Sequence, residues 1–535
     1  MNLTQINWAP LMPLLIVLGG AVLATIFEAF VPRKARRPWQ VIFSMLVILG
    51  AFIAVIWRWS AAAGEQGILT MPLSMVQTQS GISGVSFVED GFTLLGQGAI
   101  LLIAFLSILV IADRSETRES AFAASAATIP GSPKEREYTA ARYEQSEIFP
   151  LALFATGGMM AFTAAFDLLS LFIALEVLSL PLYVLSATSR RRRLLSQEAA
   201  LKYFLLGAFS SAIYLMGAAF VYGATGHLGF SEIVTVAIQS GFPSQLLTVG
   251  AVMVTIGLLF KVGAVPFHAW TPDVYQGAPT PITGFMAAGT KAAAFITLVR
   301  VYIYIASAVE ENMHVFLWIV IIATIFVGTV VGLIQRNVKR LLAYSSIAHA
   351  GFILIALSVI NLTTMTADTY VATVSSVVFY LIAYGLATVG AFAIVTLVRE
   401  QDQGGNILGE ATDLSHWAGL GKRSPLLAFA MTVFLLSFAG IPLTAGFIGK
   451  FEVFRAGIMG GSVILVVIAI LASAATAFFY FRIIQLMFFH QPAEGTVVVR
   501  SEGFAISAIV IALILTLVLG TMPDSVLTLI QGSFA

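Results

Sequence analysis

Uninterrupted apolar stretches of about 20 residues recur along the whole chain, and they limit its fold more than any other feature. A stretch of this length spans the hydrocarbon core of a bilayer as an α-helix, whereas a transmembrane β-strand needs only about 10 residues of alternating character. The pattern predicts an all-α polytopic membrane protein with about 14 spans. The approximate limits of these spans are 9–31, 39–60, 92–113, 148–166, 168–188, 198–223, 246–270, 278–307, 316–335, 339–360, 370–398, 424–449, 461–489 and 503–520.

Composition agrees with this class and excludes several functions. The chain of 535 residues is 59% hydrophobic and 10% charged, whereas soluble domains carry about 25% charged residues. It has no cysteine, which excludes disulfides and thiolate-held iron–sulfur clusters. The stretch "GATGHLG" at 223–229 lacks the spacing and context of a dinucleotide-binding motif. We therefore expect no cofactor or metal on this chain, and any redox chemistry must belong to a partner.

Basic residues in the loops predict the orientation of the spans. Lys and Arg gather after odd-numbered spans, in "PRKARRP", "SRRRRL", "QRNVKR" and "GKR". Cytoplasmic loops carry such an excess, so we expect both termini outside. Arg455, close to Lys450, is an exception to the pattern. The run Arg190–Arg193 is expected to anchor the topology at lipid headgroups, and the polar stretch 114–147 to form a surface loop. The N-terminus has no Lys or Arg before its first apolar stretch, so it does not resemble a cleaved signal peptide.

Several ionisable residues lie within the predicted spans or at a span end, where a charge at mid-bilayer costs about 2.5–3.5 kcal/mol. They are Glu176, Lys202, Lys261, Lys291, His349 and Lys450. Such residues usually face the bundle interior or water. Lys202 and Lys450 lie close enough to span ends that they could instead extend to the interface.

Glu176, Lys261 and Lys291 are too deep for that alternative. They form either a static buried ion pair or a chain of titratable groups that relays protons, because burial disfavours a charged lysine and a nearby carboxylate favours it. His349 is either a hydrogen-bonded core histidine or a further relay group. Ser345 and Ser346 make its helix face polar, although serines in apolar helices often bond to their own backbone.

Two spans contain helix-breaking residues. In "KVGAVPFHAW" at 261–270, Pro266 removes a backbone donor between Lys261 and His268. These two residues would lie about 10 Å apart on one face if the helix continued. Broken backbone at membrane depth is tolerated where it is buried in protein or lines a wet cavity, so we expect a hydrated half-channel here. The following "TPDVYQGAPTP" is predicted to be a tight cytoplasmic turn.

A second break, "AGIP" at 439–442, lies in the twelfth span. Matching broken helices in two halves indicate a transporter with inverted repeats. The predicted division of the chain is 1–113 (helices 1–3), 114–147 (polar loop), 148–307 (repeat 1, helices 4–8), 316–489 (repeat 2, helices 9–13) and 503–531 (helix 14 and tail).

Several motifs together carry a resemblance to a known family. The stretches "LFIALEVLSLPLYVL", "FKVGAVPFHAWTPDVYQGAPTPITGFMAAGTKAA", "QRNVKRLLAYSSIAHAGF" and "FAGIPLTAGFIGKF" resemble the antiporter-like membrane subunits of respiratory complex I. The resemblance covers roughly 148–490. The form "TPDVYQGAP" and a lysine, rather than a glutamate, at position 450 are most similar to the subunit N family of bacterial NADH-quinone oxidoreductase, which is related to mitochondrial subunit 2.

The resemblance implies two inverted five-helix repeats with broken helices 7 and 12, and proton translocation as part of an NADH:quinone oxidoreductase. It implies a proton relay that is formed by Glu176, Lys261, Lys291 and Lys450, with His268 and His349 along the same axis and Lys202 as a weaker match. The implied neighbours are subunits M, K and J and the lateral helix of subunit L. NADH, FMN, iron–sulfur clusters and quinone would belong to partner subunits, and the location would be the bacterial plasma (inner) membrane.

Three alternatives stay open at this stage. The chain could be a subunit of a multisubunit cation/proton antiporter, which exchanges sodium without NADH. It could be a scaffold subunit of complex I whose charges form static pairs. A remote third reading pairs His268 with His349 as haem ligands. Sequence alone does not distinguish ubiquinone from menaquinone, and it does not give the order of the proton steps.

Overall fold

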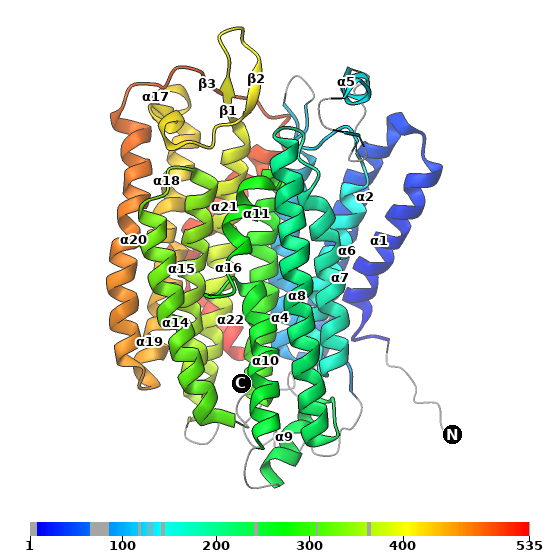
Figure 1. Ribbon diagram of the computed structural model, residues 1–535, viewed down its shortest axis with the longest axis vertical. Coiled ribbons are helices and arrows are strands. Elements are labelled where there is room, and N and C mark those ends of the chain that lie inside the picture. The colour runs from blue at the N-terminus through cyan, green and yellow to red at the C-terminus, as the bar shows by residue number, and fades with distance from the viewer. Residues whose placement is uncertain are drawn as a thin grey trace.

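The computed structural model describes residues 8–64, 85–115, 119–125, 128–129, 132–140, 145–239, 244–305, 309–360 and 365–533. Long helices run side by side in one bundle (Figure 1). Within the described chain, twelve helices are long and apolar enough to cross a membrane, and Ile148–Ala164 and Pro425–Ala439 are shorter apolar helices. The all-helical membrane fold is therefore confirmed. The count of about 14 spans and the inverted repeats stay predictions.

The helices of the first part of the chain are α1 (Met12–Phe30), α2 (Arg33–Gly64), α4 (Gly91–Ala112), α5 (Pro133–Ala140), α6 (Ile148–Ala164), α7 (Leu168–Ser186), α8 (Arg193–Thr225), α9 (Phe230–Gln239), α10 (Gln245–Val262), α11 (Trp270–Gly277), α12 (Thr280–Phe285), the π-helix η2 (Met286–Thr290) and α13 (Lys291–Tyr304). Side-chain caps begin several of them. Asp90 accepts a hydrogen bond from the backbone N–H of Thr93, and Asp167 accepts those of Leu169 and Ser170. Such caps satisfy amides that the first helical turn leaves unpaired.

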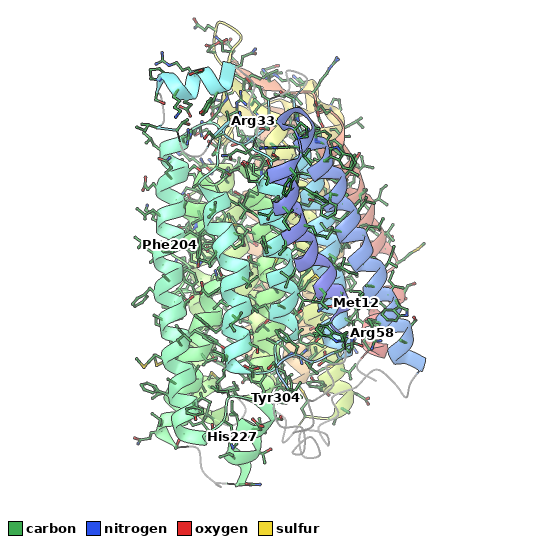
Figure 2. The ribbon with its side chains drawn as sticks, turned by 90° about the vertical axis from the view of Figure 1, so that its right-hand side faces the viewer. Met12, Arg33, Arg58, Phe204, His227 and Tyr304 are labelled. Atoms are coloured by element: carbon green, nitrogen blue, oxygen red, sulfur yellow. The ribbon has the colours of Figure 1, made fainter. Side chains whose placement is uncertain are left out.

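The second part comprises α14 (Glu310–Leu333), α15 (Val338–Ser358), α16 (Ala367–Leu397), β1 (Val398–Gln401), β2 (Ile407–Glu410), the 3₁₀-helix η4 (Leu414–Trp417), α17 (Leu420–Arg423), α18 (Pro425–Ala439), α19 (Ala445–Met459), α20 (Val463–Phe489), β3 (Thr496–Val498), α21 (Phe504–Thr521) and α22 (Asp524–Gly532). The strands form one antiparallel sheet in the order β2–β1–β3. The sheet, α5 and α17 lie at the same end of the bundle, which we call the sheet end (Figure 1). Arg33 also lies there, whereas Met12 and Arg58 lie near the other end (Figure 2).

The centre of the bundle contains α4, α12 to α13, α15 and α16, which are almost entirely buried. Helix α4 packs against α2, α6, α16 and α21. Helix α16 packs against α12, α18, α19 and α21. By contrast, α1, α2 and α20 expose large apolar side chains over much of their length, as expected for helices that face lipid.

Both predicted interruptions are present. Helix α10 ends at Val262, Gly263 adopts a left-handed conformation with φ 78°, and the Val265–Pro266 peptide bond is cis. The chain then forms α11, which continues toward the sheet end (Figure 1). The expectation of a tight turn over 271–281 was wrong, because most of this proline-containing stretch is helical. Its Pro272 lies in the first turn of α11, where a proline costs no hydrogen bond.

The second interruption separates α18 from α19 at Gly440, which has φ 79°. Helix α19 continues to Met459, so the twelfth span extends ten residues past its predicted end at 449. Arg455 therefore belongs to this helix and not to a loop, and it pairs with Glu452 at 3.4 Å.

Candidate functional site

Lys261 occupies the last turn of α10, just before the first break, and its side chain is only 3% exposed. Its Nζ donates to Tyr183 Oη of α7 at 3.4 Å and lies 5.1 Å from the ring centroids of Tyr183 and Tyr203. Gly207 of α8 makes room for the tyrosine, because a Cβ at this position would lie 2.0 Å from Tyr183 Oη. The ammonium therefore meets a hydroxyl and two aromatic faces.

Glu176, on α7, is half-buried near this lysine. Its Oε1 accepts a hydrogen bond from Ser211 Oγ of α8 at 2.5 Å. The carboxylate acts electrostatically on Lys261, but no direct ion pair joins the two among the contacts of the described residues. Glu176 therefore influences the charge of Lys261 without touching it.

Lys291 follows directly after the π-helix η2 and is fully surrounded by protein. Its Nζ donates to the backbone carbonyl of Ser346 on α15, and it lies 5.8 Å from the ring centroid of Tyr384. The hydroxyl of Ser346 is 3.4 Å from Tyr275 Oη on α11. Lys291 thus connects the core helix α13 with the face of α15 that also carries the buried histidine.

His349 lies one turn further along α15, between two tyrosines. Its Nδ1 is 2.8 Å from Tyr380 Oη, and its Nε2 is 3.2 Å from Tyr480 Oη. Tyr480 also shares a hydrogen bond with Ser345 Oγ. The alternative that Ser345 bonds only to its own helix was therefore wrong. Both ring nitrogens of His349 have tyrosine partners, which argues against a haem ligand here.

Lys450 lies in the second turn of α19, at the second break. Its side chain is 4% exposed, so it does not extend to the membrane interface. Its Nζ donates to the carbonyls of Phe438 and Ala439 at 2.8 and 3.0 Å and to Ser473 Oγ at 2.8 Å. The two carbonyls end helix α18, where the helix dipole favours a cation.

Two predicted site residues lie apart from these buried groups. His268 is half-buried inside the first break, and since α10 has already ended, it does not share a helix face with Lys261. Lys202 is 44% exposed on α8, where its Nζ forms ion pairs with Asp273 and Glu198, both at 2.8 Å. The structure therefore brings Lys261, Lys291, His349 and Lys450 into the interior, but not Lys202.

The comparisons with known proteins decide the family. The family described as "NADH:quinone oxidoreductase/Mrp antiporter, TM" matches residues 165–476, which include every candidate site residue. NADH-quinone oxidoreductase subunit N of Beutenbergia cavernae is 53% identical over 99% of this chain and 98% of its own length. The chain belongs to the subunit N family of NADH-quinone oxidoreductase.

Other relatives agree with the subunit N family. Subunit N of Acidothermus cellulolyticus is 49% identical over 98% of this chain and 95% of its own length. A chain of respiratory complex I from Thermus thermophilus with bound aureothin is 31% identical with a TM-score of 0.72, covering 96% of this chain and 98% of that one. A chain of the Mrp complex from Dietzia sp. is 20% identical with a TM-score of 0.76, over 99% and 97% of the two chains, and shows a shared fold alone.

The sequence did not reveal most of the groups that bind the buried ionisable side chains of this subunit N relative. These groups are the hydroxyls of Tyr183, Ser211, Tyr380, Ser473 and Tyr480 and the carbonyls at the end of α18. Hydroxyl residues in apolar helices are common, so no sequence signal separates these from the rest. A buried ion pair between Asp90 and Arg300 at 2.8 Å was also missed. Arg300 lies inside a predicted span and could have been found by the same argument as the lysines.

Proposed function

We propose that this chain is the antiporter-like, proton-translocating membrane subunit of an NADH:quinone oxidoreductase. The single observation that supports it best is the series of buried ionisable groups from Lys261 through Lys291 and His349 to Lys450, in a chain of the subunit N family. Redox chemistry would take place in partner subunits that hold NADH, FMN, iron–sulfur clusters and quinone. This chain would supply the route for protons through the membrane.

The way the lysines are held supports a relay over a static ion pair. A static pair predicts a carboxylate in contact with each ammonium, because an unpaired buried charge is costly. Instead, Lys261, Lys291 and Lys450 donate to hydroxyl and carbonyl oxygens. A neutral oxygen accepts a hydrogen bond from an ammonium and from a neutral amine alike. Each site can therefore hold its lysine with or without the transferred proton.

In the proposed sequence of steps, the negative charge of Glu176 keeps Lys261 protonated. When that attraction weakens, burial favours the neutral amine, and the proton moves by way of water toward Lys291, His349 and finally Lys450. A difference of about 1.4 kcal/mol changes occupancy tenfold, so small movements of Glu176 would suffice. His268 would extend the wetted path at the first break, and Lys202 would contribute through Asp273 at the surface of α8.

The proposed function also implies an orientation in the membrane, a repeat structure and a set of neighbouring subunits. The basic loops gather at the sheet end, which would face the cytoplasm, with both termini outside. Helices α6 to α13 and α14 to α20 would form the two inverted repeats. The neighbours would be subunits M, K and J and the lateral helix of subunit L, in a bacterial plasma (inner) membrane.

The two rival functions have weaker support. A sodium-exchanging antiporter is not favoured, because the relatives at 44% to 53% identity over almost the whole chain are named subunit N, whereas the Mrp chain is 20% identical. A scaffold that only holds its neighbours predicts that replacing Lys261 alters assembly and leaves proton yield unchanged.

The test uses inverted membrane vesicles with Lys261→Met, and Lys422→Met as the control. Lys422 is exposed, donates to Gln491 at 3.0 Å and lies outside the buried series. Native gels establish that each variant complex assembles, and NADH oxidation and NADH-driven acidification are measured together. We expect both rates to fall in Lys261→Met and to stay normal in the control. Normal acidification in an assembled Lys261→Met complex would refute the proposed relay.

A further inference from the structure

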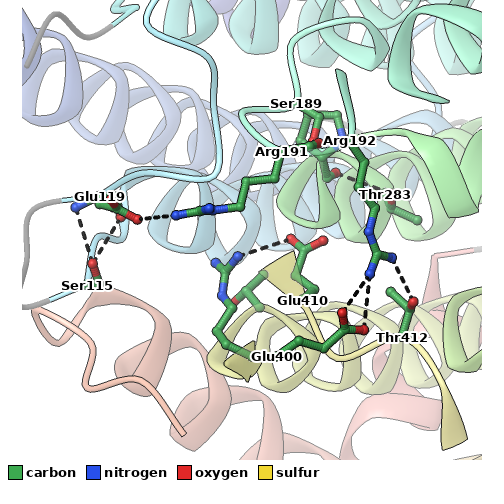
Figure 3. Close-up of polar contacts among 12 residues, drawn as sticks. Ser115, Glu119, Ser189, Arg191, Arg192, Thr283, Glu400, Glu410 and Thr412 are labelled. Carbon is green, nitrogen blue, oxygen red and sulfur yellow. Dashed lines mark hydrogen bonds and ion pairs between the residues drawn. The ribbon is translucent and has the colours of Figure 1, made fainter. Parts of the chain in front are cut away.

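The arginine run Arg190–Arg193 does more than mark the topology. Arg191 donates to Glu119 at 3.2 Å, and Arg192 reaches Glu400 of β1 at 3.0 Å and Thr412 at 2.9 Å (Figure 3). Arg193 pairs with Glu135 at 2.6 Å. Arg190 also pairs with Glu119, at 3.5 Å. The four arginines thus hold the polar stretch after α4 and the β1–β2 hairpin against the sheet end of the bundle.

A small cavity of about 30 Å³ lies beneath this arrangement. Its charged lining residues are Glu119, Arg190, Arg191, Arg399 and Glu410. A second small cavity of about 20 Å³ shares Glu119 and Arg399 and reaches Pro281 of α12. Charged side chains stabilise buried water, so these cavities are suited to hold water at the end of the core helices.

Glu410, which is labelled in Figure 3, ends β2, pairs with Arg399 at 3.8 Å and lines the first cavity. Its electrostatic neighbours include Lys339 of α15. Burial alone would raise the pKa of Glu410, but the charges of Lys339 and Arg399 outweigh it and hold the pKa below its ordinary value. The carboxylate is therefore ionised at neutral pH and attracts hydronium ions into the cavity.

Lys339 is fully buried although it lies at the start of α15. Its Nζ donates to the carbonyl of Ala278, between α11 and α12, at 2.8 Å. Thr283 Oγ1 lies 3.5 Å from the same carbonyl and 3.3 Å from that of Tyr275. Polar groups therefore continue from Lys339 into the interior.

Lys291 lies at the inner end of the same series. Tyr275 Oη meets Ser346 Oγ, whose backbone carbonyl accepts from Lys291 Nζ. Lys339 and Ser346 are seven residues apart on α15, which places them on one helix face about 10 Å apart. A few water molecules between Lys339 and Lys291 would complete a path from the cavity.

We infer that Glu410 and Lys339 form a branch of the proton path that connects the sheet-end cavity with Lys291; this inference rests on the proposed function. In the resting state Lys339 is an ammonium and Glu410 a carboxylate. The Lys339 ammonium passes a proton through water beside Thr283 to the neutral Lys291 amine. Hydronium in the cavity then protonates the Glu410 carboxylate and leaves water, and the neutral Lys339 amine takes that proton, so that Lys339 is again an ammonium and Glu410 a carboxylate.

The matched pair of variants is Glu410→Gln and Glu400→Gln in the whole complex. Both carboxylates belong to the same sheet, are 17% exposed and pair with an arginine, but only Glu410 lines the cavity. NADH:quinone turnover is measured in uncoupled vesicles, in H₂O and D₂O, with and without acetate. Uncoupling removes any effect of acetate on the proton gradient.

We expect Glu410→Gln to slow turnover about threefold to tenfold. A positioned proton-transfer group contributes roughly hundredfold to its own step. The expected loss is smaller because water can carry protons over part of the distance between the cavity and Lys339. The solvent isotope effect should rise in this variant, and acetate should restore its rate, since the arginine-rich cavity admits a small weak acid. Glu400→Gln should show none of these changes.

Two results would overturn the branch. One is a Glu410→Gln enzyme that behaves as Glu400→Gln does, and the other is a slow, assembled enzyme that acetate does not rescue, which indicates a structural role. Lys339→Met serves as a second variant, with slow turnover expected and no acetate rescue. If Lys261→Met abolishes pumping while Glu410→Gln is normal, the branch alone is wrong; if Lys261→Met pumps normally, the proposed function fails.

Discussion

The Lys261 and Lys450 sites resemble one another in their backbone and differ in what balances their charge. Each lysine is buried next to an interrupted helix whose break begins with a left-handed glycine, Gly263 in one case and Gly440 in the other. Lys261 is held by a tyrosine hydroxyl with the charge of Glu176 nearby. Lys450 is held by the two carbonyls that end α18 and by Ser473.

This difference makes the electrostatic surroundings of Lys261 adjustable and those of Lys450 constant. A carboxylate on another helix changes its influence when that helix shifts, since electrostatic energy varies with distance. The end of α18 contributes a partial negative charge that belongs to the backbone and moves only with the helix itself. We therefore expect control over proton occupancy to lie at Lys261, while Lys450 receives and releases protons against a fixed background.

The largest effect that would sharpen this contrast is expected from Glu176→Gln. Glutamine keeps the hydrogen bond from Ser211 but removes the negative charge, so Lys261 loses its proton more readily. A loss of about 1.4 kcal/mol would lower NADH-driven acidification roughly tenfold. The measurement is acidification per NADH in inverted vesicles with assembly checked by native gel. Wild-type pumping in this variant would remove the distinction between the two sites.

The next effect concerns the backbone at the second break. Gly440→Ala places a Cβ at 2.8 Å from Lys450 Cδ and forces a left-handed conformation, which costs about 1–2 kcal/mol. Gly461→Ala is the control, because its φ is 82° but nothing lies within 4 Å of the added Cβ. Thermal unfolding of the purified complex should show a larger loss for Gly440→Ala. Equal losses would mean that Lys450 adapts freely to the added methyl group.

A smaller effect is expected from Tyr183→Phe, which removes the oxygen that contacts Lys261 and keeps the ring. One such hydrogen bond contributes about 0.5–1.5 kcal/mol, so acidification should fall severalfold. The variant should also behave non-additively with Glu176→Gln, because both act on the same ammonium. Additive effects in the double variant would show that tyrosine and glutamate act on different groups.

The smallest effect is expected from Ser473→Ala at the Lys450 site. Two backbone carbonyls still accept from Nζ, so the lost hydrogen bond is partly replaced, and acidification should decrease less than twofold. Combined with Glu176→Gln, its effect should add within about 0.5 kcal/mol, as for independent distant sites. A severe defect in the single variant would indicate that the Lys450 site is as adjustable as the Lys261 site.

The ionisable groups of the site could be predicted because charge is conspicuous in an apolar helix. Lys261, Lys291 and Glu176 stood out for that reason, and Pro266 and Gly440 marked the breaks because both residues interrupt helices. Lys450 was placed too near a span end, because the charges of Lys450, Glu452 and Arg455 are typical of a loop, whereas α19 continues to Met459. Lys339 was assigned to a basic loop, because the sequence does not show that folding buries its side chain.

The partners of these groups could not be predicted in the same way. Tyr183, Tyr380 and Tyr480 are three tyrosines among many aromatic residues, and what distinguishes them is the contact that packing creates. Helix α11 was missed because Pro272, Gly277 and the prolines that follow the helix are typical of turns. Tertiary packing determines the contacts and the secondary structure of these residues, and the neighbouring sequence does not indicate them.

The contacts of Arg192 join parts of the chain that are made at different times. Glu400 and Thr412 follow this arginine by 208 and 220 residues. At about 5–20 residues per second, a ribosome needs roughly 10–40 s to add such a length. During biosynthesis the helices up to α13 are therefore complete well before the β1–β2 hairpin exists to cover their ends. A nascent chain halted before residue 398 would leave Arg192 without either partner, and the small cavity under the hairpin would be enclosed only in chains that are nearly finished.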